Sequence, residues 1–258
     1  MKICILGSCS GTEPFPNRHH TAFSIETGEQ IYWFDAGESC SHTAYTMGID
    51  LLNVSHIFIS HPHMDHVGGL CNLLWTIRKL TKVKKEQPKN GDVRVYMPSM
   101  KTWEGVLSIL EQSEGGYQND YRTVGIPIED GVLLDTPQIR VTALHNAHLK
   151  ETEPPYHSFS FLIEAEGKRI VYSGDVKDLS ELAPLLGAGC DLLLTETGHH
   201  DPAKICSRIA QKELGEVRSL RFLHHGRRIL DGHDEALAAC QAILPQVIFS
   251  NDGDTFEL

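Results

Sequence analysis

A short polar segment between a strand and a helix constrains this chain most. The segment SHPHMDH (60–66) follows an apolar strand pattern, and an amphipathic helix pattern begins at Leu70. Helical spacing alone would point His61, His63 and Asp65 in different directions, so we expect a compact loop wrapped around a bound group. Helix caps and surface polar residues explain one or two such side chains, but not all of them.

The four donors of this loop, His61, His63, Asp65 and His66, are nitrogen and oxygen ligands, which suit zinc, manganese or iron better than a thiolate site does. Four ligands are too many for one catalytic ion with an open position and too few for two. Further donors are therefore expected at the ends of other strands. The candidates are His145 and His148, Asp175, and His224 or His225.

Composition is that of a globular protein. The chain has 258 residues, 41% hydrophobic and 22% charged, with a net charge of 23 − 34 = −11, and we expect one domain over 1–258. No apolar run approaches the roughly 18 residues of a membrane span. Seven cysteines are scattered without a CxxC pair, which favours free thiols in the cytoplasm. Fifteen histidines in an acidic chain favour metal chemistry over a polyanion partner.

Short apolar or β-branched runs alternate with helix-length stretches in which apolar residues recur every three or four positions. Strands are expected over 2–6, 22–26, 31–35, 56–60, 93–97, 139–144, 158–164, 169–173, 191–195, 221–224 and 246–250. Helical spacing covers 70–80, 103–110, 205–214 and 236–244. This order predicts a layered α/β protein with substantial antiparallel pairing.

The window 78–89 holds six basic residues and one acid. One interpretation is a solvated helix end followed by an exposed loop. The other is a patch that steers phosphate groups.

With HPHMDH, a later histidine, a Gly-Asp pair after a strand and a final histidine, the chain resembles the metallo-β-lactamase-fold hydrolases over nearly its whole length. The resemblance implies a four-layer αββα sandwich with two divalent ions at one edge, zinc first, with manganese or iron as alternatives. It assigns His61, His63 and His148 to one ion and Asp65, His66 and His224 to the other, with Asp175 bridging both.

Two of these assignments rest on spacing within the family. In related sequences the ligand follows a strand valine by seven positions, which favours His148 over His145. The family's nuclease branch places the ligand first in the pattern His-x-Ser/Gly-x-Arg, which favours His224 over His225.

The segments ILGSCSGT (5–12), PNRHHTA (16–22) and FDAGESC (34–40) resemble the start of ribonuclease Z and its phosphodiesterase relatives. This branch implies that Asp65 orients the nucleophile and that His200, positioned by Glu196, protonates the leaving oxygen. The resemblance also implies a set of side chains that hold the phosphate: Arg18, His20 and Arg227.

The chain departs from the ribonucleases in two respects. It has no long Gly/Lys-rich insert, and Thr195 stands where that branch has a histidine. We therefore expect hydrolysis of a small phosphodiester, such as a cyclic nucleotide or short RNA, by a metal-bridging hydroxide.

The sequence leaves three alternatives open. The same metals would serve a lactone, thioester or carboxyl-ester hydrolase, or the chain could bind metal without turnover. A homodimer is also left open.

Overall fold

The computed structural model describes residues 1–113 and 116–258. Two seven-stranded sheets carry most of the chain. The first has the order β14 (Thr255–Glu257), β1 (Lys2–Gly7), β2 (Ala22–Thr27), β3 (Gln30–Phe34), β4 (Val54–Phe58), β5 (Val93–Met97) and β6 (Thr123–Pro127). The second has the order β13 (Ile248–Phe249), β12 (Leu220–Leu223), β11 (Leu192–Glu196), β10 (Lys168–Tyr172), β9 (Phe159–Ala165), β8 (Arg140–His145) and β7 (Gly131–Asp135).

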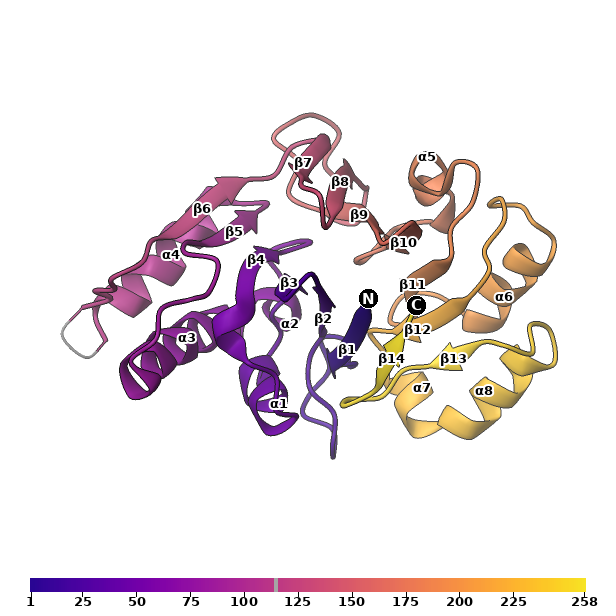
Figure 1. The fold of residues 1–258 in the computed structure, drawn as a ribbon. Helices are drawn as coiled ribbons and strands as arrows, with labels where there is room; N and C mark the ends of the chain where they lie inside the picture. The colour runs from indigo at the N-terminus through magenta and orange to yellow at the C-terminus, as the bar shows by residue number, and fades with distance from the viewer. Residues whose placement is uncertain (114–115) are drawn as a thin grey trace.

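Helices cover the outer face of each sheet, so the fold has four layers (Figure 1). The first sheet carries α1 (Cys40–Thr46), α3 (Leu70–Lys84) and α4 (Met100–Glu111). The second carries α5 (Ala183–Leu186), α6 (Pro202–Ala210), α7 (Arg227–Asp231) and α8 (His233–Gln241). Short turns of helix complete the chain: η1 (Leu51–Asn53), α2 (Met64–Val67) and η2 (Leu179–Leu182). The predicted αββα sandwich is confirmed.

The interior strands are apolar on both faces because each sheet is covered on both sides. In β1, Ile3 and Ile5 pack between the sheets, whereas Cys4 and Leu6 pack against the helices. Stacked aromatic rings fill the space between the sheets, with Phe34 and Phe58 5.0 Å apart between ring centroids. Each such buried side chain contributes about 1.5–3 kcal/mol to stability. The inter-sheet core draws on both halves of the chain, which favours the single-domain prediction.

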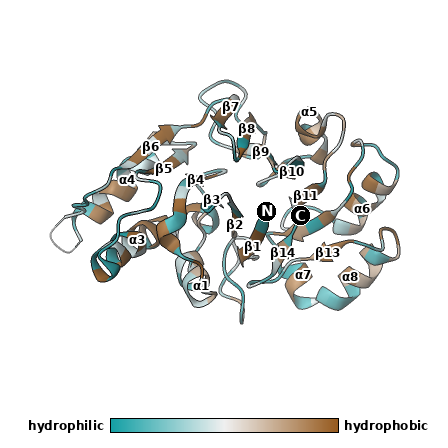
Figure 2. Ribbon diagram, viewed as in Figure 1, coloured by the Kyte–Doolittle hydropathy of each residue, from teal (hydrophilic) through white to brown (hydrophobic). Residues whose placement is uncertain are grey.

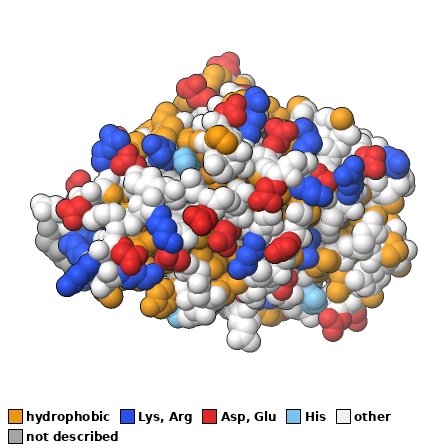
Figure 3. Space-filling view, in the orientation of Figure 1, with side chains coloured by type: hydrophobic (Ala, Val, Ile, Leu, Met, Phe, Trp, Pro, Cys, Tyr) orange, Lys and Arg blue, Asp and Glu red, His pale blue; other side chains and the backbone are white. Residues whose placement is uncertain are grey.

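The basic window at 78–89 covers the last turns of α3 and the segment that follows it. Lys84 bonds to Asp50 at 2.9 Å, and Lys85 closes the helix in a left-handed conformation. Positive side chains near a helix C-terminus interact favourably with its dipole. Figure 2 shows this end as hydrophilic, and Figure 3 shows Lys and Arg side chains gathered over it. Since α3 starts beside the histidine loop and has 15 residues, its basic C-terminal end at Lys84 lies about 20 Å from the start of the helix.

No helix in the described part of the chain is long and apolar enough to cross a membrane.

The strand ends place the polar loops together. β4, β5 and β6 run parallel in one sheet, and β10, β11 and β12 run parallel in the other. Antiparallel pairing through β9 brings the end of β8 to the same edge as the end of β10. The loops that follow β4, β8, β10, β11 and β12 therefore meet at one edge of the sandwich, as expected for carboxyl ends of parallel strands.

A buried histidine within the core makes stability sensitive to acid. His56 stacks between Tyr32 and Tyr96, and burial, helped by the charge of Arg94, lowers its pKa to about 4. As the pH falls, His56 is therefore protonated in the unfolded chain before it is protonated in the folded one. The free energy of unfolding decreases as the pH drops from about 6.5 through 4. Urea unfolding at pH 7.5 and 4.5 measures this decrease in the free energy of unfolding. We expect it to be smaller in His56→Phe than in the wild type by up to about 3 kcal/mol.

The exposed His42 on α1 supplies the control for this experiment. His42→Gln is expected to leave the pH dependence of unfolding as in the wild type. An identical acid sensitivity of the wild type and His56→Phe would rule out His56 as its source.

Candidate metal centre

The histidine loop leaves β4 at Phe58 and turns into α2 at Met64. Its backbone is held against the loop after β3, because Ala36 N donates to His66 O at 2.6 Å and Gly69 N donates to Ala36 O at 2.7 Å. A Cβ atom on Gly69 would lie 2.1 Å from the carbonyl oxygen of Gly37. Glycine is therefore required there, and the close approach holds the loop in position.

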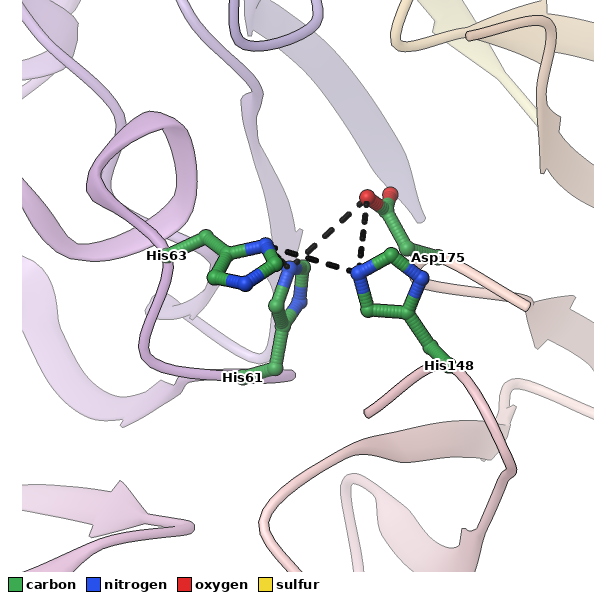
Figure 4. A group of neighbouring side chains, drawn as sticks. All are labelled: His61, His63, His148 and Asp175. Carbon is green, nitrogen blue, oxygen red and sulfur yellow. Dashed lines mark hydrogen bonds and ion pairs between the residues drawn. The ribbon is translucent and has the colours of Figure 1, made fainter. Parts of the chain in front are cut away.

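One donor cluster consists of His61, His63, His148 and Asp175, whose donor atoms all lie within 4.8 Å of one another. Figure 4 shows the side chains of His148 and Asp175 converging on those of His61 and His63, which come from one loop. His63 Nδ1 lies 3.0 Å from His61 Nε2 and 3.4 Å from His148 Nε2. Asp175 Oδ2 lies 3.7 Å from the Nε2 atoms of both His61 and His148.

A second cluster consists of Asp65, His66, His224 and, again, Asp175. His224 Nε2 lies 3.1 Å from Asp65 Oδ2 and 3.2 Å from Asp175 Oδ1. His66 Nε2 lies 3.5 and 3.4 Å from the same two oxygens. Asp175 thus turns Oδ2 to the first cluster and Oδ1 to the second. The structure brings all seven predicted ligands together in the two predicted sets.

The unpaired atoms in these clusters fit divalent cations. His66 Nε2 and Asp175 Oδ1 are buried and make no hydrogen bond to any described residue. Leaving a buried polar atom unpaired costs about 1–3 kcal/mol, so the second cluster, to which both atoms belong, lacks a partner. Imidazole nitrogens with carboxylate oxygens form the donor set of zinc, manganese and iron. The residues present therefore fit two divalent ions.

Asp35 orients the second cluster. It is fully buried, and its Oδ2 lies 2.8 Å from His66 Nδ1 and 2.6 Å from the hydroxyl of Tyr172. A neutral His66 that donates from Nδ1 keeps the lone pair of Nε2 for a cation. Burial alone would lower the pKa of His66, but Asp175 and Asp35 outweigh it and raise that pKa. This pocket thus attracts positive charge.

No role was predicted for Asp35 from the sequence. Its place directly after a strand, in a segment that resembles the ribonuclease Z family, was the available signal. That place alone does not say which histidine the carboxylate meets.

The two alternative histidines lie outside the clusters. His145 Nδ1 contacts Asp130 Oδ2 at 2.6 Å, and its ring stacks on Tyr156. His225 is buried between Thr197 and the carbonyl of Ser250. Burial lowers the pKa of His225 to about 3, so it stays neutral. The geometry favours His148 and His224, as the family spacing does.

His199, rather than His200, faces the site. Glu196 is buried, and its Oε2 accepts hydrogen bonds from the backbone and Nδ1 nitrogens of His199, at 2.8 and 2.7 Å. The hydrogen bond that His199 donates to Glu196 raises the pKa of His199. His200 turns away, with Nε2 2.8 Å from the carbonyl oxygen of Val176 and 3.7 Å from Glu196. His199 was not predicted from the sequence, because the order of two adjacent loop residues does not indicate which side chain faces the site.

The residues predicted to hold phosphate have protein partners instead. Arg18 donates to Ser8 Oγ at 2.8 Å and to Ser250 O at 3.0 Å. Arg227 pairs with Glu13, and His20 Nε2 lies 3.1 Å from Thr12 O. None of the three lines the cavity at the metal centre. These contacts do not support the predicted phosphate-binding role, because the arginines are satisfied within the loops that they join.

The cavity between the clusters has a volume of about 260 Å³. Its walls come from five loops: Ser10, Gly11, His63, Asp65, Asp175, Gly198, His199 and His224. Two carboxylates and no lysine or arginine line it. An anion would be repelled from this cavity unless cations occupied the donor clusters.

Comparisons with solved structures agree on the fold. YhfI of Bacillus subtilis, a metallo-β-lactamase fold protein, aligns with a TM-score of 0.75 at 18% identity and covers 100% of this chain and 99% of that chain. The short form of human tRNase Z aligns with a TM-score of 0.71 at 18% identity, over 100% and 99% of the two chains. Both relationships establish the metallo-β-lactamase fold.

Sequence relatives agree with the predicted branch. Ribonuclease Z of Methanocaldococcus jannaschii is 22% identical over 253 residues, which covers 79% of this chain and 76% of that protein. In several other matched ribonucleases Z, the alignment spans only 24–45% of their length. The predicted resemblance and the assignment to metal-dependent hydrolases are confirmed at this level.

A family model described as "Anti-Pycsar protein Apyc1" matches residues 1–210. The matched part contains both sheets except β12, β13 and β14, and all the predicted ligands except His224. The chain has a metallo-β-lactamase fold, and by this match it belongs to the anti-Pycsar protein Apyc1 family.

Proposed function

We propose that this protein is a dinuclear metal-dependent phosphodiesterase that cleaves a small phosphodiester, a cyclic nucleotide foremost. The observation that carries the proposal is the sharing of Asp175 by two donor clusters on the wall of one cavity. Divalent ions held there would polarise the phosphoryl oxygens and lower the pKa of the attacking water. Among the structural neighbours are a diphosphatase of the PhnP family and yeast PDE1, which supports phosphoester chemistry.

The chain's own residues have distinct tasks in this proposal. Asp65 lines the cavity and would accept a hydrogen bond from the attacking water. His199 also lines the cavity, and its Nδ1 is engaged by Glu196, which leaves Nε2 to donate a proton to the leaving oxygen. Glu196 is a positioning residue: its other oxygen accepts the backbone N–H of Val176 at 3.0 Å, which fixes the carboxylate.

The size of the cavity favours a small substrate over folded RNA. Its volume of about 260 Å³ is just below the range of about 300–1,000 Å³ that is usual for small-molecule sites. The basic end of α3, about 20 Å from the start of that helix, would be of no use to a single nucleotide.

Rates on a substrate panel test the function. The metal-loaded protein should cleave 3′,5′- or 2′,3′-cyclic nucleotides and bis(p-nitrophenyl) phosphate, and a chelator should stop each reaction. Metal analysis should give two ions per chain. Faster hydrolysis of lactones or thioesters than of any phosphodiester would overturn the substrate class, and less than one ion per chain would overturn the dinuclear site. A precursor tRNA in the same panel tests the large-substrate alternative.

A further inference from the structure

A second cavity, of about 740 Å³, opens at the same edge of the sandwich as the metal centre. Its walls include Pro98 after β5, Ile128 after β6, and Pro155 and Tyr156 from the loop that carries His148. It shares no lining residue with the cavity at the metal centre.

Sheet topology places this cavity beside the metal centre. β5 and β6 are the first and second neighbours of β4 and run parallel to it, so their ends lie roughly 5 and 10 Å along the edge from the histidine loop. Phe159, on the cavity wall, donates its backbone N–H to Ser60 O at 3.0 Å, and His61 follows Ser60 directly. The two cavities are therefore separated by about the width of one or two strands.

The lining suits a flat neutral ring and rejects phosphate. Proline rings, Ile128 and Tyr156 form apolar walls, and the lining contains no lysine or arginine. Its charged groups are the carboxylates of Glu129 and Asp130, which repel an anion. Glu129 has no hydrogen-bonding or ionic partner among the described residues, so its carboxylate, an acceptor only, remains available to an amino group.

Tyr156 is held in position before any ligand arrives. Its ring stacks on His145 with 3.8 Å between centroids and 4° between planes. His145 is fixed in turn by Asp130, which accepts from both its backbone N–H and Nδ1, at 2.6 Å each. A rigid aromatic face of this kind binds nucleobases, at about 1–3 kcal/mol per stacked base.

We infer that this cavity binds the nucleobase of the substrate, stacked on Tyr156, with Glu129 accepting from the amino group of adenine or a similar base. The inference rests on the proposed function for its substrate, a nucleotide. It also gives His145, which is not in either donor cluster, a role as support for the stacking residue.

Kinetics with and without a base test this site. In the metal-loaded protein, Tyr156→Ala is expected to raise KM for 3′,5′-cyclic AMP by about 5- to 100-fold and to leave KM for a methyl riboside 3′,5′-cyclic phosphate, which has no base, unchanged. Tyr156→Phe should behave as the wild type. Glu129→Ala should reduce the preference for cyclic AMP over cyclic IMP, which differ by that amino group, by about 3- to 10-fold.

Equal losses on both substrates in Tyr156→Ala, or no loss on either, would overturn the nucleobase site. Binding of adenosine by saturation-transfer NMR separates this failure from that of the proposed function, because adenosine has no phosphate. If wild-type protein binds adenosine and Tyr156→Ala does not, while neither hydrolyses any phosphodiester, the base site stands and the proposed reaction fails. If cyclic AMP is cleaved but adenosine does not bind, the reaction stands and the base site fails.

Discussion

Asp175→Ala is expected to lower the metal content from two ions per chain to one or fewer and to reduce kcat by at least about 10²–10³-fold. Asp175 is the one side chain common to both donor clusters, and each of its oxygens faces a different set of nitrogens. Its removal would therefore take a ligand from both proposed ions at once. Metal analysis after dialysis and initial rates on bis(p-nitrophenyl) phosphate measure the two effects separately.

Asp135→Ala supplies a matched control. Asp135 ends β7 at the edge of the sandwich opposite the donor clusters. It is exposed there, and its Oδ2 lies 3.8 Å from Nη1 of Arg140. The same substitution there should leave both the metal content and the rate at wild-type values. Two bound ions and full activity in Asp175→Ala would contradict the dinuclear centre, because no other described carboxylate joins both predicted sets of histidines.

The sequence predicted interior strands well and edge strands badly. The run at 93–97 coincides with β5, and the run at 2–6 matches β1 to within one residue. The strands that it missed, β6, β7 and β14, each form an edge of a sheet. An edge strand needs little apolar surface: β7 is mostly exposed, and β6 contains a glycine and ends in a proline. Such segments lack the apolar periodicity on which the prediction depends.

The convergence of the candidate ligands was predictable because these residues combine local spacing with positions at strand ends. Four donors within six residues leave little freedom, and His148, Asp175 and His224 each follow a strand at the edge where parallel strands end. The predicted substrate contacts had no such restraint. Arg18 is 10 residues from Ser8 and 232 from Ser250, its two partners, so only the folded chain shows that its guanidinium is already satisfied.

The direction of a loop side chain was equally unpredictable. His199 and His200 are adjacent, and both precede α6 at similar distances. The buried Glu196 determines which of the two rings faces the cavity. Its carboxylate accepts a hydrogen bond from the ring of His199, whereas the ring of His200 contacts a backbone carbonyl. The structure thus favours His199 over His200 as the proton donor, a role that stays a proposal.

His199→Ala is expected to lower kcat on cyclic nucleotides by about 10²–10⁴-fold, the usual contribution of a positioned general acid. The leaving alkoxide of a ribose needs a proton as the P–O bond breaks, and His199 is the cavity-lining histidine whose Nδ1 is fixed by a carboxylate. His200→Ala, the matched neighbour, should cost less than about tenfold, because its ring bonds to Val176 and does not line the cavity.

The leaving group separates proton donation from metal binding, since His199 lies within a third set of donors with Asp175, Glu196 and His224. If His199 donates a proton, His199→Ala should retain two ions per chain and lose little activity on bis(p-nitrophenyl) phosphate, whose leaving anion is stable without a proton. If His199 binds metal instead, the variant should lose an ion and fail on both substrates equally. A large defect on cyclic nucleotides alone, with full metal content, is therefore the result that the hydrogen bond between His199 and Glu196 predicts.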